Sequence, residues 1–213
     1  FGFQRIGDSA WQAADMRARG FLLGATAGRT TLNGEGLQHE DGHSHLLAGA
    51  IPNCKSYDPS FGYEVTVIVQ EGMQRMLQEQ RDEYYYITLM NENYQMPEMP
   101  EGSRDGILKG MYLFQEAGKA KKGELRVQLL GSGTILREAI AAAELLDKDF
   151  AVTSEIWSCP SFNELRREGF DAERCNRMHP EEEQRVSYVE QCLKGRVGPA
   201  IAATDYVRAF ADQ

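Results

Sequence analysis

Segments with helical periodicity alternate with short apolar runs in this chain, and such alternation is typical of a parallel α/β sheet. Apolar residues recur at three- and four-residue steps over residues 5–19 and, approximately, 58–80, which predicts two helices. The runs at residues 21–23 and 84–90 are rich in apolar and aromatic side chains, and we interpret both as buried strands. Residues 24–45 lack this periodicity, so we expect a long loop there.

A second alternation follows a stretch that carries Pro97, Pro100 and Gly102 among acidic residues, where we place a domain boundary or linker. Further strands are predicted at residues 125–130, 150–157 and 200–203, and further helices after residue 133, near residues 162–167 and at residues 181–193. We therefore expect two α/β domains, residues 1–99 and residues 100–213, each with its own core.

Composition excludes several classes of protein. The net charge of -9 argues against a nucleic-acid or anionic-membrane surface, because both need clustered Lys and Arg. No uncharged apolar stretch is long enough to span a bilayer. The four cysteines form no CxxC pair and match no zinc spacing, which favours a reducing compartment, and hence the cytoplasm.

The chemically richest stretch is residues 34–45, GEGLQHEDGHSH, called the histidine segment below. It holds three of the four histidines, His39, His43 and His45. Imidazole titrates near neutral pH, so these side chains could move protons or bind a metal. A solvated polar loop whose histidines cap backbone groups is an open alternative. A metal site that includes Asp41 is a third, although the spacing matches neither HExxH nor another common zinc pattern.

Two further patterns have simpler interpretations. Gly131–Ser132–Gly133 lies between a predicted strand and a predicted helix, where phosphate could meet helix amides. The position of a third glycine is occupied by Leu136, so we interpret the pattern as turn geometry. The acidic triplet at residues 181–183 is expected to begin a helix, where carboxylates suit the positive end of the dipole.

Several stretches closely resemble the family of homodimeric bacterial pyruvate dehydrogenase decarboxylases. They are residues 1–8 (FGFQRIGD), 29–45, 51–54, 84–88, 91–94 and 127–133. The resemblance runs nearly end to end, and the histidine segment is its most specific part. It implies two transketolase-like α/β domains with mostly parallel sheets. These are the later part of a pyrimidine-binding domain and an incomplete C-terminal domain, so we expect an internal fragment of a longer protein.

The resemblance also implies thiamin diphosphate with magnesium as cofactor, and it suggests roles for four residues. Phe1 would stack on the aminopyrimidine ring, and His39 would lie beside the reactive carbon and the bound pyruvate. Glu35 would lie near the same pocket or the dimer contact. Arg5 would lie beside an acidic tunnel that joins two active sites.

The implied activity is decarboxylation of pyruvate followed by reductive acetylation of the lipoyl domain of dihydrolipoamide acetyltransferase, carried out by a homodimer. The chain has no Gly-Asp-Gly with a downstream asparagine pair, the family's magnesium and diphosphate signature. The activating glutamate would precede Phe1. We therefore expect no metal ligands in this chain and no activity of the chain alone. Transketolase, 2-oxoglutarate dehydrogenase and a non-catalytic α/β interaction module are the alternatives, although the Asp-Gly-Pro and Thr-His pattern of transketolase is not present.

Overall fold

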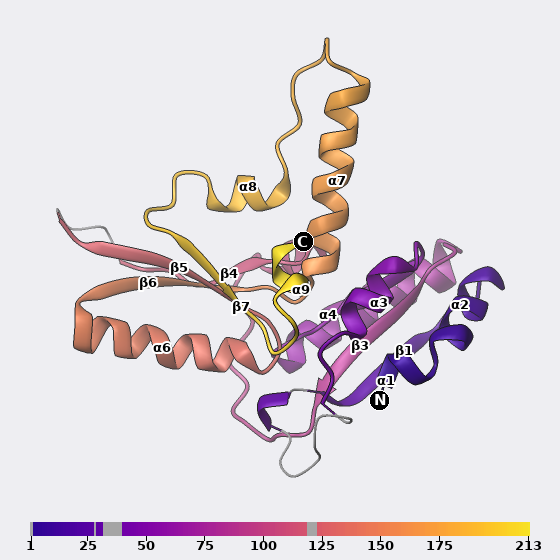
Figure 1. Ribbon diagram of the computed structural model, residues 1–213, viewed down its shortest axis with the longest axis horizontal. Coiled ribbons are helices and arrows are strands. Elements are labelled where there is room, and N and C mark those ends of the chain that lie inside the picture. Colours follow the sequence, from indigo (N-terminus) through magenta and orange to yellow (C-terminus); the bar gives the residue numbers. More distant parts are fainter. Residues whose placement is uncertain (1, 28, 32–39, 119–122) are drawn as a thin grey trace.

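A computed structural model describes residues 2–27, 29–31, 40–118 and 123–213, which form two sheets side by side (Figure 1). The first sheet is entirely parallel, with the order β1 (Phe21–Ala27), β3 (Tyr84–Met90), β2 (Cys54–Tyr57). The second has the order β4 (Tyr112–Gln115), β6 (Val152–Ser158), β5 (Leu125–Gly131), β7 (Ala200–Ala203), and only β4 runs antiparallel. The expected α/β fold with mostly parallel sheets is confirmed.

Strand β3 lies at the centre of the first sheet, and its tyrosines fill the core on both faces. Tyr84 and Tyr86 pack with α1 (Gly2–Arg5), α2 (Gly7–Asp15) and α3 (Ser44–Ala50). Tyr85 and Ile87 point to the opposite face, where they pack with α4 (Gly62–Met73) and the π-helical turn η2 (Gln74–Gln78). Because a parallel strand is buried on both faces, a nearly continuous apolar run is what such a strand requires.

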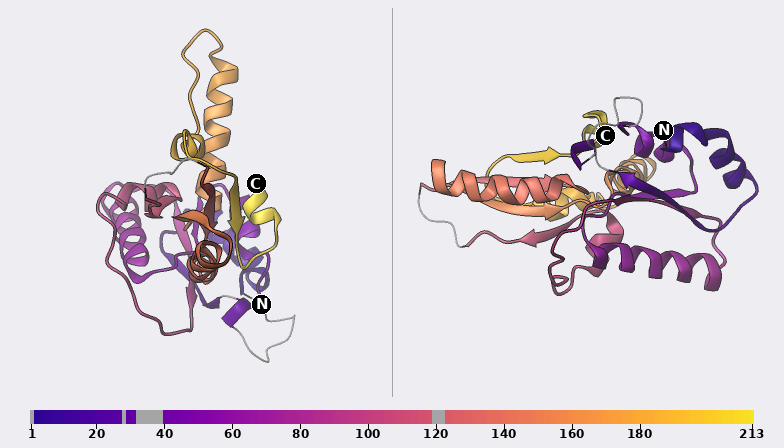
Figure 2. Two further views of the ribbon diagram at one scale, coloured as in Figure 1. Left: turned by 90° about the vertical axis from the view of Figure 1, so that its left-hand side faces the viewer. Right: turned by 90° about the horizontal axis from the view of Figure 1, so that it is seen from below.

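The second sheet is covered on one face by α6 (Ile135–Phe150), whose Leu136, Ala139 and Ala143 pack on the strands. The other face carries α7 (Phe162–Met178), α8 (Tyr188–Leu193) and α9 (Ala209–Asp212). Helix α7 projects away from both sheets, and α4 and α6 lie in opposite halves of the molecule (Figures 1 and 2). In the described ranges, no helix combines the length and apolarity needed to cross a bilayer.

Several predicted elements differ from the structure. The first predicted helix is split between α1 and α2 and ends at Asp15, and the predicted loop at residues 24–45 begins as the last part of β1 and ends in α3. The acidic triplet at residues 181–183 does not begin a helix, because α7 ends just before Pro180 and α8 starts later, where the Ser187 side chain caps it.

Short elements were not expected from the sequence. Strands β2 and β4 have only four residues each, and α5 (Arg104–Lys109) has six. Segments of that length show too few periodic positions to be recognised. We expect a linker at residues 94–104, and residues 91–103 contain no helix or strand, while Arg104 begins α5.

Glu64 joins the two sheets through a fully buried carboxylate. It is the third residue of α4, and it accepts hydrogen bonds from the backbone N–H groups of Ser60 and Phe61, which helps the helix to begin. Its other oxygen accepts from the hydroxyls of Tyr112 on β4, at 2.7 Å, and Ser158 on β6, at 2.6 Å. Burial raises the pKa of the Glu64 carboxyl, and these hydrogen bonds oppose the shift.

A second set of polar contacts ties α7 to β2. The Ser161 hydroxyl, which caps α7, donates to the carbonyl oxygen of Ser56 at 2.6 Å, and the Asn163 amide donates to the Ser56 hydroxyl. Lys55 pairs with Glu164 at 2.6 Å, and both side chains are largely buried. The relative position of the two sheets is therefore set by directional bonds as well as by apolar packing.

Replacing Glu64 by alanine tests this junction. Four buried donors would lose their acceptor, so we expect the free energy of unfolding to fall by about 3 kcal/mol in urea denaturation followed by circular dichroism. Glu71→Ala on the same helix is the matched control, because the Glu71 carboxylate pairs with partly exposed Arg104, and its loss should cost less than about 1 kcal/mol. Equal losses in the two variants would contradict the assignment.

Candidate functional site

The carboxyl ends of strands from both sheets meet at one junction. Asp58 follows β2, Thr88 lies near the end of β3, Ser132 follows β5, and Tyr206 lies shortly after β7. These four side chains lie within hydrogen-bonding distance of one another or share a partner. Because ligands of open α/β sheets bind outside the carboxyl ends of the strands, this junction is the candidate functional site.

The Asp58 carboxylate lies at the centre of the junction and is only 4% exposed. One oxygen accepts from the Thr88 hydroxyl at 2.6 Å, and the other accepts from the Ser132 hydroxyl at 2.9 Å. The backbone of Asp58 also forms two hydrogen bonds. Its N–H donates to the carbonyl oxygen of Pro160 at 2.7 Å, and its carbonyl oxygen accepts from the N–H of Gly133 at 3.0 Å. Burial raises the pKa of Asp58 to about 6, and the hydrogen bonds from Thr88 and Ser132 oppose that shift.

Asp58 occupies the position at the Gly131–Ser132–Gly133 turn where a phosphate could have been bound. Gly133 has φ +49°, and a Cβ atom built on it would lie 2.5 Å from an oxygen of Asp58. Glycine is needed there for both reasons. The start of α6 is therefore closed by a carboxylate of the same chain, and the diphosphate group of a cofactor does not fit at this turn.

His45 lies directly beside this carboxylate. Its ring is fully buried, stacks on Phe210 with centroids 5.0 Å apart, and meets the Tyr206 ring edge to face at 4.8 Å. Its Nε2 atom is 3.1 Å from the Thr88 hydroxyl oxygen. Since Thr88 donates its proton to Asp58, its oxygen is left to accept from Nε2–H of His45. Burial lowers the pKa of His45 to about 4, and nearby Asp41 opposes the shift, so the ring is neutral at neutral pH.

The described side chains of the histidine segment, residues 40–45, do not come together as a group of potential metal ligands. Asp41 accepts from the backbone N–H groups of His43 and Ser44, at 3.1 and 2.9 Å, and so caps α3. The His43 side chain is exposed, and His45 faces the aromatic cluster. In the described part of the chain, the only group of three potential metal ligands that converges is His179, Glu181 and Glu182, and all three are exposed on the surface.

Of the four residues singled out by the resemblance, the structure describes one. Arg5 is exposed at the end of α1. Phe1, Glu35 and His39 lie outside the described residues. The described parts of the chain on either side of Glu35 and His39 are η1 (Arg29–Thr31), shortly after β1, and residues 40–45, which lead into α3 and the junction.

Sequence reasoning missed the residues at the centre of the junction. The helix predicted over residues 58–80 begins at Asp58, whereas α4 begins later, at Gly62. Thr88 belongs to the predicted strand at residues 84–90. A rule that selects polar residues at the carboxyl ends of predicted parallel strands finds Thr88 and Ser132, but it does not find Asp58, because the sequence does not predict β2.

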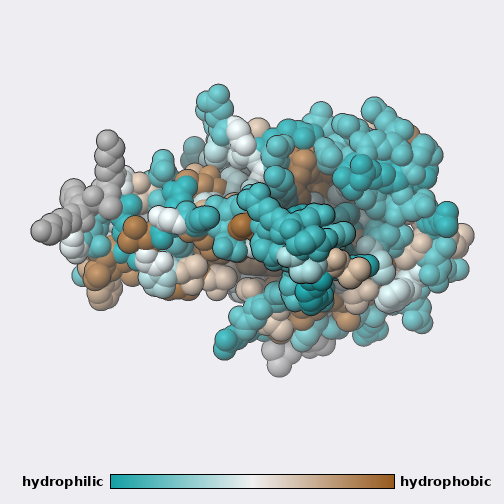
Figure 3. Space-filling view, turned by 90° about the horizontal axis from the view of Figure 1, so that it is seen from above, coloured by the Kyte–Doolittle hydropathy of each residue, from teal (hydrophilic) through white to brown (hydrophobic). Residues whose placement is uncertain are grey.

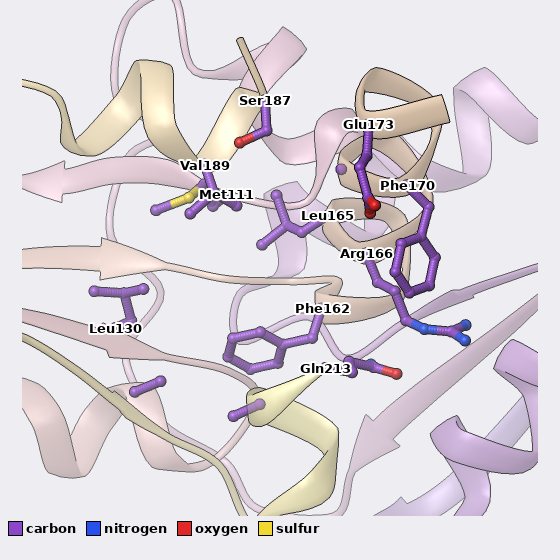
Figure 4. A pocket seen from close by; sticks show the side chains of 13 residues that line it. Met111, Leu130, Phe162, Leu165, Arg166, Phe170, Glu173, Ser187, Val189 and Gln213 are labelled. Atoms are coloured by element: carbon purple, nitrogen blue, oxygen red, sulfur yellow. The ribbon is translucent and has the colours of Figure 1, made fainter. Parts of the chain in front are cut away.

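A separate cavity of about 420 Å³ lies between α7 and α8 (Figure 4). Apolar side chains such as Leu130, Phe162 and Leu165 line it, and Arg166 and Glu173 belong to its α7 wall. None of the junction residues contributes to it, so we do not connect it with the site. The face of the molecule on the side toward which α7 projects is mainly hydrophilic, with apolar side chains in its hollows (Figure 3).

Comparison with known families divides the chain into two matched regions. Residues 1–97 match the family described as pyruvate dehydrogenase E1 component middle domain. Residues 110–213 match the transketolase-like TK C-terminal domain.

Proteins named pyruvate dehydrogenase E1 component are similar over the whole chain. The identity is 64% for Cupriavidus necator, 62% for Pseudomonas aeruginosa and 56% for Escherichia coli. The chain spans 24% of the length of each of these relatives. Among solved structures, transketolase from Campylobacter jejuni has a TM-score of 0.68 at 19% identity, over 94% of this chain and 26% of that one. Transketolase from Leishmania mexicana has a TM-score of 0.56 at 16% identity, over 94% and 25%. These structures show a common fold.

Asp58 and His45 give opposite pH dependences of stability. Between its ordinary pKa of 3.8 and about 6, Asp58 is protonated in the folded state and ionised in the unfolded state, so it stabilises the fold more as the pH falls. Between about 4 and 6.5, His45 is neutral in the folded state and protonated in the unfolded state, so it stabilises the fold less as the pH falls. The two contributions largely cancel.

Asp58→Asn should expose the contribution of His45. The amide cannot titrate, so between pH 6.5 and 4.5 the free energy of unfolding of the variant should fall by on the order of 2 kcal/mol more than that of the unmodified chain. His45→Gln is the reciprocal variant and should change in the opposite direction. Urea denaturation at the two pH values measures both, and parallel pH profiles for all three proteins would refute the assigned protonation states.

Proposed function

Because this chain belongs to the family of pyruvate dehydrogenase E1 components, we propose that it supplies part of the active site of an enzyme that decarboxylates pyruvate with thiamin diphosphate. The supporting observation is the identity of 62–64% to two proteins of that name, which covers the whole chain and so includes the histidine segment. We assign residues 1–99 to the later part of the pyrimidine-binding domain and residues 100–213 to the C-terminal domain. The rest of the enzyme would resemble the remaining three quarters of these relatives.

We further propose that the acetyl unit passes to the lipoyl domain of dihydrolipoamide acetyltransferase and that the enzyme is a homodimer. The word "component" in the names of the relatives supports membership of a multienzyme complex. The four cysteines are free thiols, which supports a cytoplasmic location. The transketolase structures share the fold at under 20% identity, so they support no sugar-transfer activity.

The cofactor we propose is thiamin diphosphate with magnesium. When bound, it supplies the nucleophilic carbon and accepts the electrons released with carbon dioxide. The residues of this chain could bind only part of this cofactor. Its strand-to-helix turn at residues 131–133 is filled by Asp58, and its sequence lacks the Gly-Asp-Gly signature. We therefore place the diphosphate and magnesium ligands outside this chain.

The chain's own contribution would come from four side chains. The ring of Phe1 would stack against the aminopyrimidine ring, and Arg5 would lie beside the acidic tunnel between the active sites. The imidazole of His39 would hold the carboxylate or carbonyl oxygen of pyruvate when protonated, and it would move protons because it titrates near neutral pH. Glu35 would lie in the same pocket or at the dimer contact.

His39→Gln in the cofactor-loaded enzyme tests the role of that imidazole. Loss of a group that transfers protons and holds the substrate should lower kcat for pyruvate decarboxylation by roughly a hundredfold or more. His43→Gln is the matched control, because its exposed ring belongs to the same segment and should leave kcat within about twofold. Equal activity of the two variants would remove His39 from the reaction.

Titration calorimetry tests whether the isolated chain of 213 residues can hold the cofactor. With no diphosphate or magnesium ligands of its own, it should show no tight, magnesium-dependent heat of binding with thiamin diphosphate. The complete enzyme is the positive control. Tight binding by the isolated chain would mean that the diphosphate site had been placed wrongly.

A further inference from the structure

Asp205, in the second domain, accepts hydrogen bonds from Thr30, which lies just before the histidine segment. The backbone N–H of Thr30 donates to one oxygen of Asp205 at 2.9 Å, and the Thr30 hydroxyl donates to the other at 2.7 Å. Both are hydrogen bonds to a charged acceptor, which is the stronger kind. The two residues are 175 positions apart, so this contact forms only when the second domain is docked on the first.

Val207, two residues after Asp205, contacts the described residues on the other side of the stretch that contains His39. Its backbone N–H donates to the carbonyl oxygen of Gly42 at 3.0 Å. Gly42 is buried, and a Cβ atom built on it would lie 3.4 Å from the Val207 side chain and 3.5 Å from that of Arg29. Arg29 also pairs with Glu40 at 3.7 Å, which links the two ends directly.

Residues 205–210, called the brace below, pack against both domains through Tyr206 and Phe210. Phe210 is 1% exposed, in the core of the second domain, and it stacks on His45 of the first domain. The Tyr206 hydroxyl is 3.5 Å from Asp58, and Tyr206 meets His45 edge to face. The brace is therefore fixed to both domains, and it can hold the residues on either side of the undescribed stretch in a defined position.

We propose that Asp205 is a positioning residue of the pyruvate site: through Thr30, it fixes residues 29–31, which precede the histidine segment, relative to both sheets. The inference rests on the function proposed above for His39. Asp205 does not touch the substrate. Its effect on the reaction is indirect, because a displacement of about 1 Å in a reacting group can lower the rate by roughly a hundredfold.

The structure separates this role from a general contribution to stability. Thr30 is exposed and Asp205 is partly exposed, so neither side chain fills the core. Surface polar contacts of this kind contribute little to the free energy of unfolding. A positional role predicts a large effect on catalysis with a small effect on unfolding, whereas a structural role predicts the reverse.

The test uses Asp205→Ala, Thr30→Val and the double variant in the complete, cofactor-loaded enzyme. Alanine removes the acceptor of both Thr30 donors, so kcat for pyruvate decarboxylation should fall roughly tenfold to a hundredfold. The KM for pyruvate should change less than kcat. The double variant should be no worse than Asp205→Ala, because that substitution already removes both hydrogen bonds from Thr30. Asp212→Ala is the control, since the Asp212 carboxylate pairs with exposed Arg208, and it should keep full activity.

Amide hydrogen exchange gives a readout that does not depend on activity. In Asp205→Ala, peptides that contain residues 29–31 and 40–44 should exchange faster, while those from β3 and β5 keep their protection. An unchanged kcat and unchanged exchange would overturn the proposal. Losses that multiply in the double variant, or faster exchange throughout both domains, would overturn it too. If the unmodified enzyme does not decarboxylate pyruvate, the proposed function fails, and the exchange pattern alone then decides whether Asp205 positions the segment.

Discussion

The relation between the two sheets depends on the carboxylate of Asp58, buried where the ends of both sheets meet. A buried carboxylate is costly unless its oxygens are satisfied, and here Thr88 supplies one hydrogen bond from the first sheet while Ser132 supplies another from the second. Neither sheet alone offers both donors. The cost of burying Asp58 is therefore offset only in the docked arrangement. The same holds for Glu64, whose carboxylate accepts hydrogen bonds from Tyr112 and Ser158 of the second sheet.

The docked arrangement determines what surrounds the described part of the histidine segment. His45 lies among the rings of Tyr86 on β3 and of Tyr206 and Phe210 after β7. Asp205 and Val207 contact the described residues on either side of the stretch that contains His39. In the function we propose, the C-terminal domain therefore contributes to the position of active-site residues. Its contacts on either side of that stretch help, in our proposal, to position the imidazole of His39 for the substrate.

The fold was largely predictable because its longest elements have clear periodic patterns. Strand β3, strand β5 and helix α6 each carry an apolar run or stripe that identifies them without knowledge of the rest of the chain. Burial of a polar group is a property of tertiary contacts. Glu64 near the start of a helix is expected to be exposed, and only docking of β4 and β6 buries it. The resemblance pointed to Phe1, Glu35 and His39, and their roles stay predictions.

The central proposal is that the imidazole of His39 acts beside the pyruvate carbon that loses its carboxylate, and that Asp205 and Val207 fix the described residues on either side of it. A crystal structure of the complete enzyme with thiamin diphosphate and an unreactive pyruvate analogue tests it most directly. We expect the imidazole of His39 within hydrogen-bonding distance of the analogue's carboxylate or carbonyl oxygen, with both bonds from Thr30 to Asp205 intact. An imidazole directed into solvent, away from the analogue, would contradict the account.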